Sequence, residues 1–125
     1  MSPKVLLVDD SGLARRSTRR LLEQAGYDVV EAEDGLSALE RFAVDKPDIV
    51  LLDLVMRGMY GLDVLEKLRE MDPVARVIVI SADVQTSSRE MVQAAGASGF
   101  INKPAPAGEI VAMIRQVLEG IGPWN

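Results

Sequence analysis

The sequence predicts one α/β domain with a doubly wound parallel sheet, in which five strands alternate with five helices. Three observations support this fold class. The length of 125 residues suits one compact domain. Short apolar runs recur along the chain without alternating polar residues, which is typical of strands buried on both faces. Between these runs, the apolar residues return at helical spacing.

Five segments have the composition of buried strands. The three clearest are the apolar runs at residues 5–8, 49–52 and 77–80, and two weaker candidates are residues 28–31 and 99–102. Runs that are apolar throughout indicate a parallel sheet covered by helices.

A helical pattern occupies each segment after a strand. The first helix has Leu21 and Leu22 before Gly26, and the second has Leu39 and Phe42 after the N-cap candidate Asp34. The third has Val64, Leu65 and Leu68 before Pro73, and the fourth has Val92 and Ala95 after a Ser87–Glu90 capping box. The fifth has Ile110, Ile114 and Val117 between Pro106 and Gly122. Five βα units in one domain imply right-handed crossovers and a three-layer sandwich with helices on both faces. The flavodoxin-like strand order 2-1-3-4-5 needs only five strands, so it fits this length.

The composition excludes several kinds of chemistry and partner. The chain has no cysteine and no histidine, which removes disulfides, thiolate nucleophiles, Cys/His zinc sites and imidazole bases. The net charge of -5 argues against nucleic acid or an anionic membrane as the main partner. No segment resembles a membrane span or a signal peptide, so we expect a cytoplasmic protein.

Polar residues follow four of the predicted strands. Asp9 and Asp10 follow the first, Asp53 the third, Ser81 the fourth and Lys103 the fifth. In open parallel sheets, ligands bind at the carboxyl ends of the strands where the strand order reverses, which here is between the first and third strands. We therefore expect the three carboxylates to converge in one cleft, flanked by a hydroxyl and an ammonium group.

Three adjacent carboxylates repel one another unless a cation lies among them. Oxygen ligands from few side chains favour Mg²⁺, and a divalent ion beside a hydroxyl and an ammonium group suits a phosphoryl group. The acceptor would then be a carboxylate, and Asp53 is the better candidate because Asp9 and Asp10 form a pair. Plainer roles also exist: an Asp after a strand is often a helix cap, and Ser81 and Lys103 could be ordinary turn and surface residues.

Four segments together resemble the receiver domain of bacterial two-component response regulators. They are Val8-Asp9-Asp10, Leu51-Leu52-Asp53-Leu54, Ile80-Ser81-Ala82 and Gly99-Phe100-Ile101-Asn102-Lys103-Pro104, in this order and spacing. The resemblance covers essentially the whole chain and is strongest to the stand-alone, chemotaxis-type receivers, because the sequence stops after the fifth helix. It implies a single receiver domain over residues 1–125 without an effector domain.

The resemblance implies a role for each of these residues. Asp53 would accept a phosphoryl group from the phosphohistidine of a sensor histidine kinase or phosphotransfer protein. The ligands of Mg²⁺, or of Mn²⁺ in its place, would be Asp9, Asp10, Asp53 and the backbone carbonyl of Val55. Ser81 and Lys103 would each bind a phosphoryl oxygen.

The resemblance also implies a conformational switch. Ser81 would move toward the phosphoryl group and leave space for Phe100 to rotate inward, although an aromatic side chain at this position is equally well explained as part of the core. Lys103 and Pro104 would be joined by a cis peptide bond. A downstream target protein would bind the face made by the fourth helix, fifth strand and fifth helix, with no nucleic acid or membrane partner.

Two positions depart from the family pattern. Arg57 stands where the family usually has Pro, and Tyr60 stands where a small polar residue is common. These residues predict a less rigid loop after Asp53 that carries an additional cation and ring.

Four arginines lie within six positions of the first helix: Arg15, Arg16, Arg19 and Arg20. Their helical spacing predicts a basic ridge next to the acidic cleft. The simpler interpretation is a solvated face, and the sharper one is a docking surface for an acidic kinase or phosphotransfer partner.

Three function classes follow from these residues. The leading one is a phosphorylation-switched signalling module that is not an enzyme beyond its own phosphoryl transfer and hydrolysis. A Mg²⁺-dependent phosphohydrolase acting on an external substrate is the second, but such enzymes typically have an acidic residue two positions after the nucleophile, where this chain has Val55. The third is a phosphorylation-independent scaffold, which is disfavoured because every residue expected to take part in phosphoryl transfer is present.

Overall fold

A computed structural model of the protein describes residues 2–56, 58–82 and 86–121, so Arg57 lies outside the described residues. It confirms the predicted α/β fold. The strands are β1 (Lys4–Val8), β2 (Asp28–Ala32), β3 (Ile49–Asp53), β4 (Val77–Ser81) and β5 (Gly99–Asn102), and the helices are α1 (Gly12–Gln24), α2 (Gly35–Asp45), α3 (Gly61–Met71), α4 (Thr86–Ala94) and α5 (Ala107–Leu118). All strand pairs are parallel, in the order β2-β1-β3-β4-β5.

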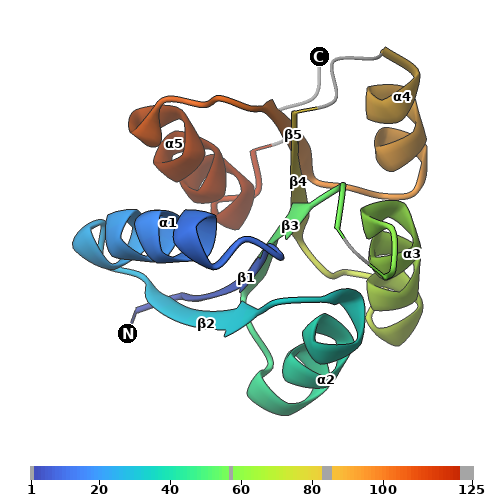
Figure 1. The fold of residues 1–125 in the computed structure, drawn as a ribbon, viewed down its shortest axis with the longest axis horizontal. Helices are drawn as coiled ribbons and strands as arrows, with labels where there is room; N and C mark the ends of the chain where they lie inside the picture. Colours follow the sequence, from blue (N-terminus) through green and yellow to red (C-terminus); the bar gives the residue numbers. More distant parts are fainter. Residues whose placement is uncertain (1, 57, 83–85, 122–125) are drawn as a thin grey trace.

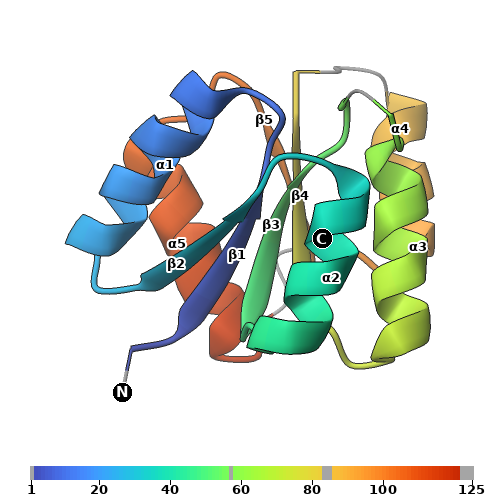
Figure 2. The ribbon, with the colours of Figure 1, turned by 60° about the horizontal axis from the view of Figure 1, so that its bottom comes forward.

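The helices lie in two layers, one on each face of the sheet. Helices α1 and α5 cover one face, and α2, α3 and α4 cover the other (Figures 1 and 2). Successive side chains of β1 point to opposite faces of the sheet. Leu6 and Val8 belong to the apolar cluster on the α2–α4 side, and Val5 and Leu7 belong to the apolar cluster on the α1–α5 side. Both faces of the strands are therefore buried, which explains their unbroken apolar sequences.

Two helix boundaries differ from those predicted. Helix α4 begins at Thr86, so Ser87 lies inside it and is not the residue that precedes it. Helix α5 ends at Leu118, well before Gly122. Gly120, with a φ of 82°, donates to the carbonyl of Val117, and Ile121 donates to that of Gln116. This Schellman motif closes the helix at a residue whose missing Cβ permits the left-handed conformation.

The predicted N-cap of α2 is confirmed. The Asp34 side chain accepts hydrogen bonds from the backbone N–H and the hydroxyl of Ser37, both at 2.8 Å. None of the helices in the described part of the chain combines the length and the apolar character that crossing a membrane would require.

Candidate functional site

Asp53 ends β3 and lies at the carboxyl edge of the sheet. Only 7% of its surface is exposed. Its Oδ2 accepts a hydrogen bond from Lys103 Nζ at 2.9 Å, and its Oδ1 accepts one from the backbone N–H of Val55 at 3.1 Å. Both carboxylate oxygens are thus oriented by donors from two different segments.

Asp9 follows β1 and lies beside Asp53, because β1 and β3 are neighbours in the sheet. It is also buried, at 6% exposure. Its Oδ1 accepts a hydrogen bond from the backbone N–H of Ser11 at 2.9 Å, and its Oδ2 lies 3.5 Å from Lys103 Nζ. Asp9, Asp53 and Lys103 form what we call the acidic cluster, in which one ammonium group faces two carboxylates.

Strands β4 and β5 place the remaining polar residues at the same edge. Ser81 ends β4, is fully buried, and pairs in register with Asn102 of β5. The backbone N–H of Lys103 donates to the carbonyl of Ser81 at 2.8 Å, and the Lys103–Pro104 peptide bond is cis. The structure therefore brings Asp9, Asp53, Ser81 and Lys103 to one edge, as the strand order predicted.

The electrostatics of the acidic cluster follow from the burial of its groups and from the charges that they place side by side. Burial raises the pKa of Asp53 above its usual value, against the lowering effect of Lys103 and of the Val55 N–H, and the charge of Asp9 adds to the increase. Burial acts to lower the pKa of Lys103, but the hydrogen bond and charge of Asp53 and the charge of Asp9 together raise it. The charged form of Lys103 is therefore stabilised, whereas burial disfavours the ionised form of Asp53.

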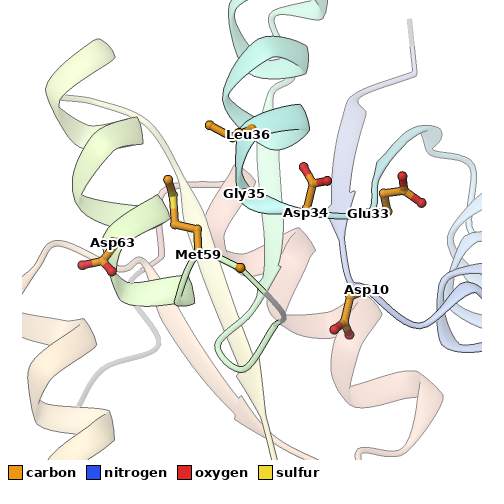
Figure 3. Close-up of a pocket in the computed structure, with 8 residues that line it drawn as sticks. Asp10, Glu33, Asp34, Gly35, Leu36, Met59 and Asp63 are labelled. Carbon is orange, nitrogen blue, oxygen red and sulfur yellow. The ribbon is translucent and has the colours of Figure 1, made fainter.

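Asp10 is the residue after Asp9, and its convergence with Asp9 and Asp53 stays a prediction. Its side chain lines a neighbouring groove of about 720 Å³ (Figure 3). The other lining residues come from the β2–α2 segment, the loop before α3 and the first turn of α3; they are Glu33, Asp34, Gly35, Leu36, Gly58, Met59 and Asp63. No three acidic side chains among the described residues are grouped closely enough to hold a metal ion in this conformation.

The groups at this edge nevertheless have the chemistry that a hard divalent cation requires. Asp9 and Asp53 offer carboxylate oxygens, and Asp10 is the residue adjacent to Asp9. Mg²⁺ is typically bound through one or two carboxylates and several waters, so the residues present fit this ion. The burial of Asp53, which disfavours its ionised form, is a second reason why a cation would be favoured here.

Three other residues singled out in the sequence lie around the cluster. Val55 is exposed, and its side chain contributes no polar group next to Asp53. Phe100 is half-buried and packs against the apolar cluster on the α2–α4 side, so its packing is that of a core aromatic, and its switching role stays a prediction. Tyr60 directly precedes α3 and is partly exposed.

The arginines of α1 divide into two pairs. Arg15 Nε donates to Glu31 Oε1 at 3.0 Å, and Arg19 Nη1 donates to Glu31 Oε2 at 2.6 Å. We call these three residues the arginine bridge, which joins α1 to β2. Arg16 and Arg20 are exposed and form no ion pair with any described residue. The predicted ridge is therefore half bridge and half solvated face.

The sequence prediction did not include the role of Arg15 and Glu31. Arg15 Nη1 also donates to the backbone carbonyl of Asp9 at 2.5 Å, which ties the bridge to the acidic cluster. The signal that could have found it is Glu31 itself, a charged residue inside a predicted buried strand.

Comparison with known proteins gives a consistent result. The sequence model of the response regulator receiver domain family matches residues 5–115. The chain is 36% identical over 118 residues to the chemotaxis protein CheY of Thermotoga maritima, covering 94% of this chain and 98% of that protein. It is 37% identical over 118 residues to the transcriptional regulatory protein CseB of Streptomyces coelicolor, covering 94% of this chain but only 50% of that protein. The chain thus spans nearly all of one relative and half of the other.

Among solved structures, the fold is similar to one in the crystal structure of a CheX–CheY–BeF3–Mg complex from Borrelia burgdorferi. The TM-score is 0.87 at 31% sequence identity, and the match covers 91% of this chain and 87% of that one. The complex named there contains a CheY protein together with magnesium and a protein partner.

Proposed function

This chain belongs to the response regulator receiver domain family of two-component signalling, and we propose that it is a phosphoacceptor switch whose acceptor is Asp53. The observation that carries the proposal is the environment of Asp53. This carboxylate is buried at the carboxyl edge of the sheet, is held by Lys103 at 2.9 Å, and has a second carboxylate, Asp9, on the other side of the same ammonium group.

In the proposed reaction, an oxygen of Asp53 attacks the phosphorus of a phosphohistidine on a sensor histidine kinase or phosphotransfer protein. An O–P bond forms on Asp53 while the N–P bond of the donor breaks, and the electron pair of that bond stays on the imidazole nitrogen. Developing charge in such a transfer is spread over three equatorial oxygens that need separate donors. Lys103 and Ser81 are the residues of this chain that would bind two of them.

Asp9, Asp10, Asp53 and the carbonyl of Val55 would hold Mg²⁺ or Mn²⁺ beside the phosphoryl group. The chemistry that the bound ion supplies is neutralisation of charge on the transferring group. The hydrogen bond that Asp9 accepts from the backbone N–H of Ser11 fixes the direction of its carboxylate, which supports this role. Asp10 would act from its place at the edge of the neighbouring groove.

Phosphorylation would be transmitted through the elements that follow Ser81 and Lys103. Ser81 ends β4 and Lys103 follows β5, so a shift of either residue toward a phosphoryl group would displace β5 and the chain that leads into α5. We therefore propose the face made by α4, β5 and α5 as the surface that binds a downstream target protein, with Ser81 and Phe100 as its switch. We propose that residues 1–125 form one receiver domain that acts in the cytoplasm.

Labelling with acetyl phosphate and Mg²⁺ tests the proposal directly. Intact-protein mass spectrometry should show the addition of one phosphoryl group, with the acid-stable and base-labile behaviour of an acyl phosphate. Asp53→Asn and chelation with EDTA should each abolish the addition, and Asp63→Asn, an exposed carboxylate of α3, should not. Labelling that persists in Asp53→Asn would show that the acceptor is another residue.

A further inference from the structure

Arg15 connects two parts of the molecule that the proposed chemistry treats separately. Its guanidinium donates through Nε to Glu31 of β2 and through Nη1 to the backbone carbonyl of Asp9. The Arg15 side chain is only 17% exposed, and its own backbone N–H donates to the carbonyl of Ser11, the N-cap of α1. The backbone of Arg15 is therefore fixed in the first turn of α1, and its guanidinium is fixed by two acceptors.

The carbonyl that Arg15 binds belongs to the peptide unit between Asp9 and Asp10. A peptide unit is planar, so fixing the direction of its carbonyl also fixes the direction of the N–H and Cα of the next residue. The hydrogen bond thus sets the orientation from which Asp10 projects relative to Asp9. The N–H of Asp9 is fixed independently, because it donates to the carbonyl of Ala32 at 3.2 Å.

Glu31 holds the guanidinium in the orientation that reaches Asp9. The carboxylate accepts from Arg15 on one oxygen at 3.0 Å and from Arg19 on the other at 2.6 Å. An arginine can serve a carboxylate and a carbonyl at the same time because its donors form a rigid planar fork, and a lysine cannot reproduce this geometry. Arg19 shares Glu31 but makes no hydrogen bond to the backbone of Asp9 among the described residues.

We propose that Arg15 is a positioning residue that orients the Asp9–Asp10 peptide unit and thereby sets the affinity of this edge of the sheet for a divalent cation. The inference rests on the proposed function, in which these carboxylates bind Mg²⁺. It goes further in assigning the affinity to a residue that touches neither the ion nor the phosphoryl group. Outer-shell contacts of this kind typically change metal affinity by about 10- to 100-fold.

The sign of the effect separates positioning from simple electrostatics. Removing a positive charge near a cation site should tighten Mg²⁺ binding if charge alone mattered. Loss of the hydrogen bond to the Asp9 carbonyl should weaken it, because the carboxylates would no longer be oriented. Arg15→Lys keeps the charge and loses the fork, so it isolates the geometric contribution.

The test is a titration of the protein with MgCl2, followed by isothermal titration calorimetry and by the Mg²⁺ dependence of the melting temperature. Arg15→Gln and Arg15→Lys are the test variants. Arg19→Gln is the control for loss of an ion pair to Glu31, and Arg16→Gln is the control for loss of a charge on α1. All four are compared after their folding has been verified by circular dichroism.

We expect Mg²⁺ binding to weaken about tenfold in both Arg15 variants and less than twofold in the two controls. Unchanged or tighter binding in Arg15→Lys, or equal weakening in Arg15→Gln and Arg19→Gln, would overturn the inference. If Arg15→Gln does not fold, Arg15→Lys decides alone. Wild-type protein that binds no Mg²⁺ would instead refute the metal site of the proposed function, so the two failures are distinguishable.

Discussion

The acidic cluster and the arginine bridge are neighbouring groups of charges with opposite balances. In the acidic cluster, two buried carboxylates share Lys103, and the pKa of Asp53 is raised, first by burial. In the arginine bridge, one carboxylate lies between two guanidinium groups, and the pKa of Glu31 is lowered, first by its hydrogen bond to Arg19. Asp9 belongs to the first group, and its carbonyl is bound by the second.

The difference indicates that the two groups respond oppositely to added positive charge. A cluster that lacks positive charge is destabilised as it stands and gains from an incoming cation or from protonation. In the arginine bridge, the Glu31 carboxylate is already paired with two guanidinium groups. It therefore gains no stability from an additional cation, and it stabilises the contact between α1 and β2. Neutralising a carboxylate should therefore stabilise the acidic cluster, where the pKa of Asp53 is raised, and destabilise the arginine bridge, where the pKa of Glu31 is lowered.

The largest expected effect is that of Lys103→Ala in the acidic cluster. It leaves Asp9 and Asp53 buried without their shared cation, and removing one partner of a buried pair costs about 3 to 5 kcal/mol. Since the Lys103 side chain is 31% exposed, we expect a loss of about 2 to 3 kcal/mol in the free energy of unfolding. Urea unfolding in EDTA measures it.

Two further variants make this prediction specific to charge. Lys67→Ala removes a lysine whose ion pair with Glu70 is long, at 3.9 Å, and highly exposed, so it should cost less than about 0.5 kcal/mol. Adding Asp53→Asn to Lys103→Ala should recover part of the loss, because one of the unpaired charges is then absent. Equal losses in the two lysine variants would contradict the buried-cluster interpretation.

Glu31→Gln should have the next largest effect, through the arginine bridge. The variant loses a charged acceptor for both Arg15 and Arg19, and we expect a loss of about 1 to 2 kcal/mol near pH 7. Because the pKa of Glu31 is lowered in the folded state, its stabilising contribution is complete above the usual glutamate pKa of about 4.3. It is lost as the pH falls through the folded-state pKa.

Chemical denaturation across this pH range gives the difference between wild type and Glu31→Gln. The difference should shrink in acid. Glu66→Gln, an exposed position on α3, should show almost no difference at any pH. A Glu31→Gln loss that stays constant as the pH falls would mean that the bridge stabilises by packing and not by charge.

Much of the fold and part of the site follow from local sequence patterns. The unbroken apolar run of β3 predicts a doubly buried strand, and the parallel order then places Asp53 next to Asp9 without further information. The direction of Asp10 and the pairing of Arg15 with Glu31 cannot be predicted in this way. They depend on side-chain rotamers and on the register that sets Glu31 beside Leu7, which only the packed structure defines.

Of the three main variants, Asp53→Asn should have the smallest effect, and this effect should be a gain in stability in the absence of metal. Burial raises the pKa of Asp53, so its ionised form is disfavoured in the folded state and the cost is complete only above the folded-state pKa. An amide of the same size removes that cost while its oxygen can still accept from Lys103, and we expect a gain of about 1 kcal/mol at pH 7 in EDTA. The gain should vanish as the pH falls below about 4, where the carboxyl is protonated in both states.

Asp63→Asn is the control, because it removes a carboxylate from the first turn of α3. It should lose a few tenths of a kcal/mol of stability through the helix dipole. If Asp53→Asn is less stable than wild type in EDTA at pH 7, the Lys103 ion pair outweighs the burial of Asp53, and the acidic cluster then resembles the bridge.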